Sequence, residues 1–103
     1  KISGVVLWAA YPSDAFRIDD KTINVVSIYG TEDDRILPDD IETSKLHLPK
    51  NTQFVQIDGG NHIQFGWYDD EVEYQKGDGL AFITRERQQD IVVKSTVDFL
   101  GQI

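Results

Sequence analysis

The stretch that decides the fold lies at residues 23–33 and reads INVVSIYGTED. Its first part, Ile23–Tyr29, is mostly apolar and β-branched, which is typical of a strand buried on both faces of a sheet. Gly30 ends this run, and the polar residues Thr31, Glu32 and Asp33 follow it. Continuous apolar strands of this kind occur mainly in parallel sheets. The stretch therefore predicts a buried parallel strand with an acidic loop at its carboxyl end.

Two further strands flank this stretch along the chain. Ile2–Ala10 reads ISGVVLWAA, a nearly unbroken apolar run that predicts another strand covered on both faces. Gln53–Ile57 reads QFVQI and predicts a third strand, which Asp58-Gly59-Gly60 stops.

Two helices are expected between and after these strands. Pro38 suits the first turn of a helix, and the acidic residues beside it favour a helix N-terminus, so we expect a short helix from Pro38 to about Leu46. Its predicted apolar side consists of Ile41, Leu46 and Leu48, with Pro49 closing the helix. A longer helix is expected from Arg85 to about Gly101, with Thr84 as its N-cap. Its predicted apolar face consists of Val92, Val93, Thr96, Phe99, Leu100 and Ile103.

The order strand, strand, helix, strand, helix predicts an α/β domain: three parallel strands with a short crossover helix and a C-terminal helix. Three strands and two helices are too few to cover such a sheet. We therefore expect residues 1–103 to form the C-terminal portion of a single, larger α/β domain. The remainder would be missing, or would come from a second copy or another chain.

Composition excludes several function classes. The 103 residues include 18 acidic and 10 basic side chains, giving a net charge of −8, which repels phosphate backbones and makes nucleic acid a poor partner. No apolar run approaches the roughly 18 residues that a membrane span needs. The absence of cysteine removes thiol catalysis and cysteine-based zinc sites.

An acid and a histidine follow the second and third expected strands. Ligand sites in open α/β sheets lie at the carboxyl ends of the strands, and both Asp33 and His62 belong to loops that leave such ends. His62 follows Asp33 by 29 positions, which fits one strand–helix–strand crossover of about 30 residues. The spacing therefore predicts that the two side chains lie together. A carboxylate that accepts the Nδ1 proton leaves the other ring nitrogen free to act as a general base.

These residues also carry a resemblance to a known family. The chain resembles the C-terminal part of α/β-hydrolase fold proteins, and especially the bacterial branch near dienelactone hydrolases and carboxylesterases. The resemblance rests on the stretches GVVLWAAY (Gly4–Tyr11), SIYGTED (Ser27–Asp33), GGNHIQFG (Gly59–Gly66) and GDGLAFI (Gly77–Ile83). It covers essentially the whole chain. It implies a partial α/β-hydrolase fold, with these residues supplying the sixth to eighth strands and the last helix.

The resemblance implies catalysis by a serine triad on an ester, lactone or related acyl substrate, with no cofactor and no metal. Asp33 matches the triad acid and His62 the triad base. The nucleophile of the Gly-x-Ser-x-Gly motif has no match, because none of the serines has that glycine frame; they are Ser3, Ser13, Ser27, Ser44 and Ser95. The chain alone is therefore expected to be inert. The acidic insert Asp69–Glu73 departs from the family pattern and leaves the shape of that loop open.

Several simpler interpretations stand beside this one. Asp33 could only cap a turn, Asp34 is the competing acid, and His62 could be a loop histidine held by backbone groups. His47 is expected at the surface near the end of the short helix. Five aromatic residues could line an acyl pocket or simply pack: Trp8, Tyr11, Phe65, Trp67 and Tyr68.

The acidic clusters Asp33-Asp34, Asp39-Asp40 and Asp69-Asp70-Glu71 lack the ligand spacing of a calcium loop, so we interpret them as solvated surface. The alternative function is a non-catalytic α/β interaction module that pairs through an open sheet edge. A receiver-type signalling domain is a weaker alternative, because no lysine follows at a suitable strand end. The unpaired edge beside Ile2–Ala10 predicts self-association, or pairing with the missing N-terminal half.

Overall fold

The computed structural model describes residues 2–12, 17–19, 22–67 and 77–103. Its three strands are β1 (Gly4–Trp8), β2 (Asn24–Gly30) and β3 (Gln53–Ile57), and they form one parallel sheet in the order β1-β2-β3. The predicted α/β class and all three predicted strands are confirmed. β2 is central among these strands, and its apolar side chains are buried as its sequence indicates.

The helices begin where the sequence places them. α1 (Pro38–Ser44) continues into the 3-10 turn η2 (Lys45–His47), and α2 (Arg85–Leu100) ends the chain. The N-terminus of α2 is capped by the Thr84 hydroxyl, which accepts a hydrogen bond from the Arg87 N–H at 3.1 Å. Within the described ranges, no helix is long and apolar enough to cross a membrane.

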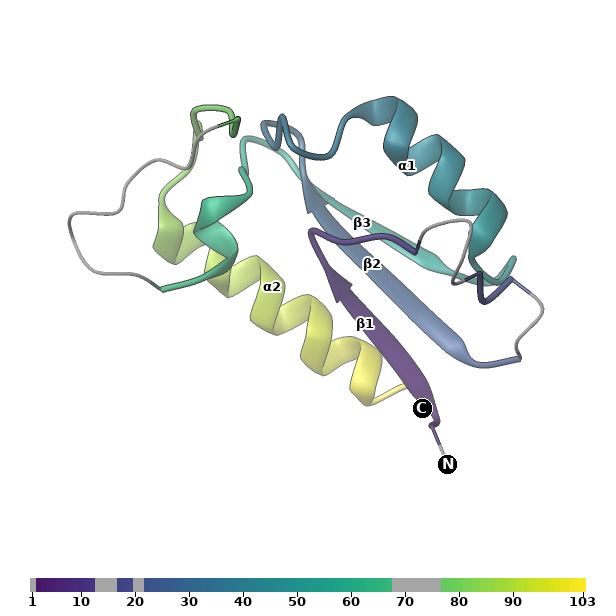
Figure 1. Ribbon diagram of the computed structural model, residues 1–103. Coiled ribbons are helices and arrows are strands. Elements are labelled where there is room, and N and C mark those ends of the chain that lie inside the picture. The colour runs from purple at the N-terminus through teal and green to yellow at the C-terminus, as the bar shows by residue number, and fades with distance from the viewer. Residues whose placement is uncertain (1, 13–16, 20–21, 68–76) are drawn as a thin grey trace.

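Each face of the sheet carries its own helix and its own apolar cluster (Figure 1). Side chains alternate between the faces along a strand, so neighbouring residues of β2 enter different clusters. The cluster under α2 contains Val26, Ile28, Ile57, Val92 and Phe99. The cluster under α1 contains Ala9, Ile36 and Ile41, with Tyr29 and Phe54 packed against them.

β1 is only half-buried, because it lies at an edge of the sheet formed by the described strands, where an unpaired edge was expected. Two expectations about which apolar helix residues are buried are wrong. Leu46 is exposed, because the chain tightens into η2 after α1 and turns this side chain away from the sheet. On α2, Val93 and Leu100 are exposed, whereas the polar Gln88 is fully buried. The buried stripe of α2 is therefore rotated from the predicted one towards Gln88, Val92 and Phe99.

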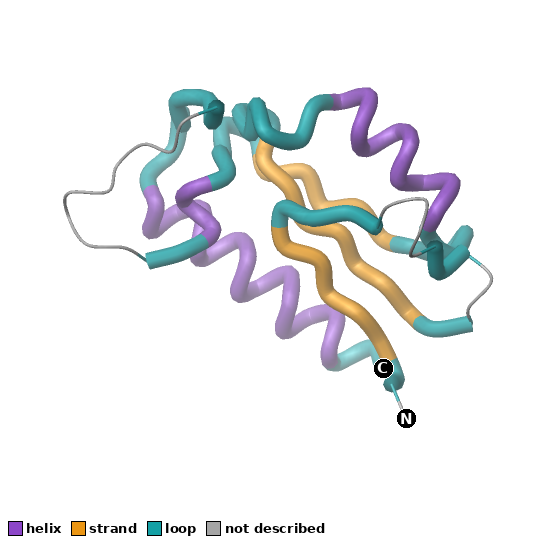
Figure 2. The backbone as a smooth tube through the Cα atoms, in the orientation of Figure 1, coloured by secondary structure: helices purple, strands orange, loops and turns teal. Residues whose placement is uncertain are grey.

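The loops that leave β2 and β3 meet at the carboxyl end of the sheet (Figure 2). The backbone N–H of Glu32 donates to the carbonyl of Gly60 at 2.8 Å, and that of Thr31 donates to the carbonyl of Ile57 at 3.1 Å. This close approach requires a glycine at position 30, because a Cβ there would overlap the Gly60 carbonyl oxygen. The contact between two backbones holds the acidic loop and the His62 loop against one another.

We expect Gly30→Ala to lower the free energy of unfolding by about 1–3 kcal/mol or more, because the methyl group forces two packed backbones apart. Gly101→Ala is the matched control: its Cβ meets nothing closer than 3.5 Å, and the backbone there is helical. Urea unfolding of both variants measures the difference. Equal stability of the two variants would contradict the close-packed arrangement of the two loops.

Candidate functional site

The acid of the site is held by its own loop. Asp33 follows β2, and its side chain is fully buried. Its Oδ1 accepts hydrogen bonds from the backbone N–H groups of Arg35 at 2.9 Å and Ile36 at 3.2 Å. An aspartate that accepts from backbone groups two and three residues further along is a common turn-forming arrangement. The turn-capping interpretation of Asp33 is therefore correct for one oxygen, and it leaves Oδ2 free for another partner.

The histidine reaches this second oxygen from the neighbouring loop. β3 ends at Ile57, and the turn through Gly59 has a φ of 84°, a conformation that glycine adopts without strain. His62 lies just beyond, and its Nδ1 is 2.8 Å from Oδ2 of Asp33. The ring is 28% exposed, whereas the carboxylate side chain has no exposed surface. The pair thus consists of a buried carboxylate and a histidine ring that is partly exposed to solvent.

This geometry fixes what the ring can do chemically. A carboxylate accepts hydrogen bonds and does not donate them, so Nδ1 of His62 carries the proton. Nε2 of the neutral ring then has a free lone pair, and within the described part of the chain it has no hydrogen-bond partner. When Nε2 gains a proton, the buried charge of Asp33 stabilises the imidazolium. The arrangement is suited to general acid–base chemistry at Nε2.

Neither Asp34 nor His47 belongs to the acid–histidine pair. Asp34 is exposed, and the hydrogen bond of His62 goes to Asp33, so the pair uses Asp33. The expectation that His47 is a surface residue is wrong: it is buried, because the connection before β2 packs over η2 and the Ile18 N–H donates to the His47 carbonyl at 2.9 Å. In that same connection the Arg17 guanidinium hydrogen-bonds to Asp19 and lowers the pKa of that exposed carboxyl.

The four aromatic candidates among the described residues do not form one pocket. Trp8 is half-exposed and donates from its indole nitrogen to the Thr96 hydroxyl at 3.2 Å, which is a packing role. Phe65 packs against both apolar clusters. Tyr11 and Trp67 are exposed. Tyr68 lies outside the described residues, as does the acidic insert Asp69–Glu73.

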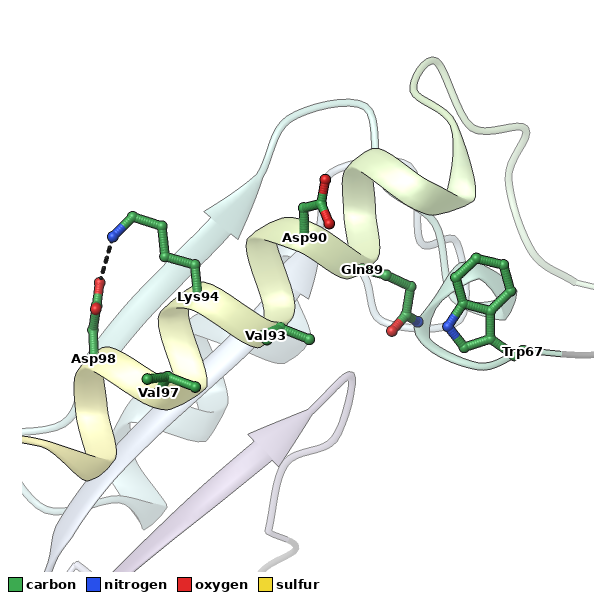
Figure 3. Close-up of a pocket in the computed structure, with 7 residues that line it drawn as sticks. All are labelled: Trp67, Gln89, Asp90, Val93, Lys94, Val97 and Asp98. Atoms are coloured by element: carbon green, nitrogen blue, oxygen red, sulfur yellow. Dashed lines mark hydrogen bonds and ion pairs between the residues drawn. The ribbon is translucent and has the colours of Figure 1, made fainter.

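A groove on the outer face of α2 involves Trp67 but neither member of the acid–histidine pair (Figure 3). The Trp67 ring lies beside Gln89, and Val93 and Val97 continue the apolar surface along the helix. Lys94 and Asp98 form an ion pair at 3.0 Å along its edge. No group of three or more metal-binding side chains occurs among the residues that the structure describes.

Sequence reasoning missed two buried polar residues that contact the His62 loop. Gln88 of α2 accepts a hydrogen bond from the Asn61 N–H at 3.1 Å and donates to the Asn61 carbonyl at 2.8 Å. Asp78 accepts from the backbone N–H groups of His62 and Ile63, each at 3.0 Å. Gln88 lies four positions before Val92 and so on the apolar side of α2, but its polar side chain kept it out of a pattern read from apolar residues. Asp78 lies in the stretch GDGLAFI (Gly77–Ile83) that carries the family resemblance, but sequence reasoning gave it no role.

Comparison with known proteins agrees with this architecture. A search of curated proteins and a search of solved structures each returned no match. The profile of the Alpha/beta hydrolase family matches residues 1–90, which include all three strands, α1 and both members of the acid–histidine pair. The chain therefore belongs to the alpha/beta hydrolase family.

Proposed function

We propose that this chain supplies the acid and the base of a serine hydrolase that acts on an ester, lactone or related acyl substrate. The observation that carries the proposal is the 2.8 Å contact between Asp33 Oδ2 and His62 Nδ1, with Nε2 unpartnered among the described residues. Membership of the Alpha/beta hydrolase family supports the same assignment. The chemistry needs only protein side chains and water.

The proposed reaction uses His62 twice. Nε2 takes the proton of a serine hydroxyl as its oxygen attacks the substrate carbonyl, and the Asp33 carboxylate stabilises the resulting imidazolium. The imidazolium then returns the proton to the leaving alkoxide, which leaves an acyl-serine. In the second half, Nε2 takes a proton from water as the water attacks the acyl group, and the proton passes to the serine oxygen. The products are a carboxylic acid and an alcohol.

We propose that the nucleophile and the oxyanion hole come from outside these 103 residues. Ser27 is buried within β2, and the Ser44 hydroxyl donates to the carbonyl of Ile41 at 2.7 Å. Among the described residues, no serine hydroxyl hydrogen-bonds to His62. Ser13 lies outside the described residues. The chain is, on this proposal, the C-terminal portion of a larger hydrolase domain.

The uncovered apolar surface supports this proposal. β1 is a half-buried edge strand, although its sequence is typical of a fully covered one. On α2, the apolar residues Val93, Val97 and Leu100 are more than half exposed, at 55%, 59% and 56%. A strand edge and a helix face of this kind are suited to pairing with further elements of the same domain.

The same surface favours the alternative function, a non-catalytic interaction module. Its open strand edge would pair with a strand of a partner or of a second copy. This alternative gives no reason for the buried Asp33 carboxylate to face a histidine ring, so we prefer the hydrolase.

We expect Asp33→Asn to lower kcat for a short-chain p-nitrophenyl ester on the order of 10⁴-fold, and His62→Ala by at least as much, in the complete protein. The amide loses the charge that orients and stabilises the imidazolium. Asp34→Asn is the matched control and should leave kcat unchanged, because this neighbouring carboxylate is exposed and does not contact His62. Loss of activity in Asp34→Asn with retention in Asp33→Asn would reverse the assignment.

We expect a fluorophosphonate probe to label the complete protein on a serine outside residues 1–103, and to leave residues 1–103 alone unlabelled. The probe reports a serine that is activated by a base and an oxyanion hole. Mass spectrometry of the labelled peptides locates the site. Stoichiometric labelling of Ser3, Ser13, Ser27, Ser44 or Ser95 would overturn the missing-nucleophile proposal.

Produced alone, residues 1–103 should self-associate, because the β1 edge and the α2 face remain uncovered. Size-exclusion chromatography with light scattering should give a mass above the 11.7 kDa monomer that rises with concentration. Val97→Lys should shift the equilibrium towards the monomer, whereas Glu42→Lys on the exposed side of α1 should not. A clean monomer at all concentrations would contradict the proposal.

A further inference from the structure

The loop that carries His62 depends on side chains for its backbone hydrogen bonds. Four successive backbone N–H groups, those of residues 61–64, donate to side-chain oxygens and not to backbone carbonyl groups. Their acceptors are Gln88 Oε1 for Asn61, Asp78 Oδ1 for His62, Asp78 Oδ2 for Ile63 and Asn61 Oδ1 for Gln64. Buried backbone donors need an acceptor, so these side chains determine the path of the loop.

Asp78 has the largest share of these contacts. Besides the N–H groups of His62 and Ile63, its Oδ1 also accepts from the N–H of Gly79 at 2.9 Å. Its residue exposure is 5%, so its carboxylate is directed at backbone groups and not at solvent. Hydrogen bonds to a charged acceptor are about twice as strong as those between neutral groups. The two amides that flank the His62 side chain are thus held by one buried carboxylate.

The segment around Asp78 also touches the acidic loop. A Cβ at Gly79 would overlap the carbonyl oxygen of Glu32, so the two backbones are in direct contact. On its other side, the Gly79 carbonyl accepts a hydrogen bond from the Asn61 side-chain amide at 2.9 Å. The segment therefore packs against both the loop that carries Asp33 and the loop that carries His62.

We infer that Asp78 is a positioning residue for His62: its carboxylate holds the His62 backbone so that Nδ1 reaches Asp33. It acts through the loop and does not touch substrate. The catalytic consequence of this role rests on the proposed hydrolase function, whereas the structural consequence does not.

The test compares Asp78→Ala with the wild type in the complete protein. By NMR, the backbone amides of His62 and Ile63 should exchange with solvent faster, and the far-downfield resonance of the His62 Nδ1 proton should broaden as the ring leaves Asp33. With a short-chain p-nitrophenyl ester, kcat should fall about 10- to 100-fold while KM stays unchanged, because misplacement of a base affects the chemical step. Asp58→Ala is the control and should match the wild type, because this carboxylate is exposed and accepts its hydrogen bond from the Gln56 side chain.

Asp78→Asn covers the case in which Asp78→Ala does not fold. An amide has one acceptor oxygen and one NH₂ group, so whichever way it turns, one of the two flanking amides meets a donor. We expect faster exchange at His62 or Ile63 in this variant and wild-type exchange in Asp58→Asn. Wild-type exchange, ring resonance and kcat in a folded Asp78 variant would overturn the inference. If His62→Ala keeps full activity, the proposed function fails, and the amide and ring signals still decide the role of Asp78.

Discussion

The hydrogen bond between His62 and a fully buried carboxylate is the interaction on which the site depends. An ionised carboxyl group is costly to remove from water unless donors surround it. Among the described residues, Asp33 has three donors: two backbone N–H groups and the His62 ring. The two backbone N–H groups orient the Asp33 carboxylate independently of the His62 ring. The ring therefore meets a preorganised acceptor, and its outer nitrogen remains free for chemistry.

Backbone contacts beneath this pair make it possible. β2 and β3 are neighbouring parallel strands, so their loops leave the same edge of the sheet. Gly30 lets the first loop pack directly on the Gly60 backbone, and Gly79 packs in the same way on Glu32. Three segments that are distant in sequence are thereby brought into direct backbone contact. Asp78 and Gln88 then supply the acceptors that the His62 loop lacks.

Much of this arrangement could be predicted from the sequence, because its signals are local. The apolar run Ile23–Tyr29 and the QFVQI stretch indicate strands, and the polar residues after each indicate loops at one sheet edge. The crossover length then places Asp33 beside His62. The burial of β1 could not be predicted correctly, since an edge strand and a central strand can have the same apolar sequence.

The buried polar contacts could not be predicted, because they depend on which backbone group lies opposite each side chain. Gln88 is a polar residue, yet it is fully buried where α2 meets the Asn61 backbone. His47 is buried because a distant connection covers it. Such contacts arise from tertiary packing and leave no periodic signal in the sequence.

The tautomer of the neutral His62 ring tests most directly whether Asp33 is the hydrogen-bond partner of Nδ1. Long-range nitrogen–proton NMR of the complete, ¹⁵N-labelled protein distinguishes the two neutral tautomers of that ring. For the neutral ring we expect a proton on Nδ1 and a bare Nε2. A neutral ring with its proton on Nε2 would contradict it, because Asp33 would then not be the partner of Nδ1 and no base would face a serine.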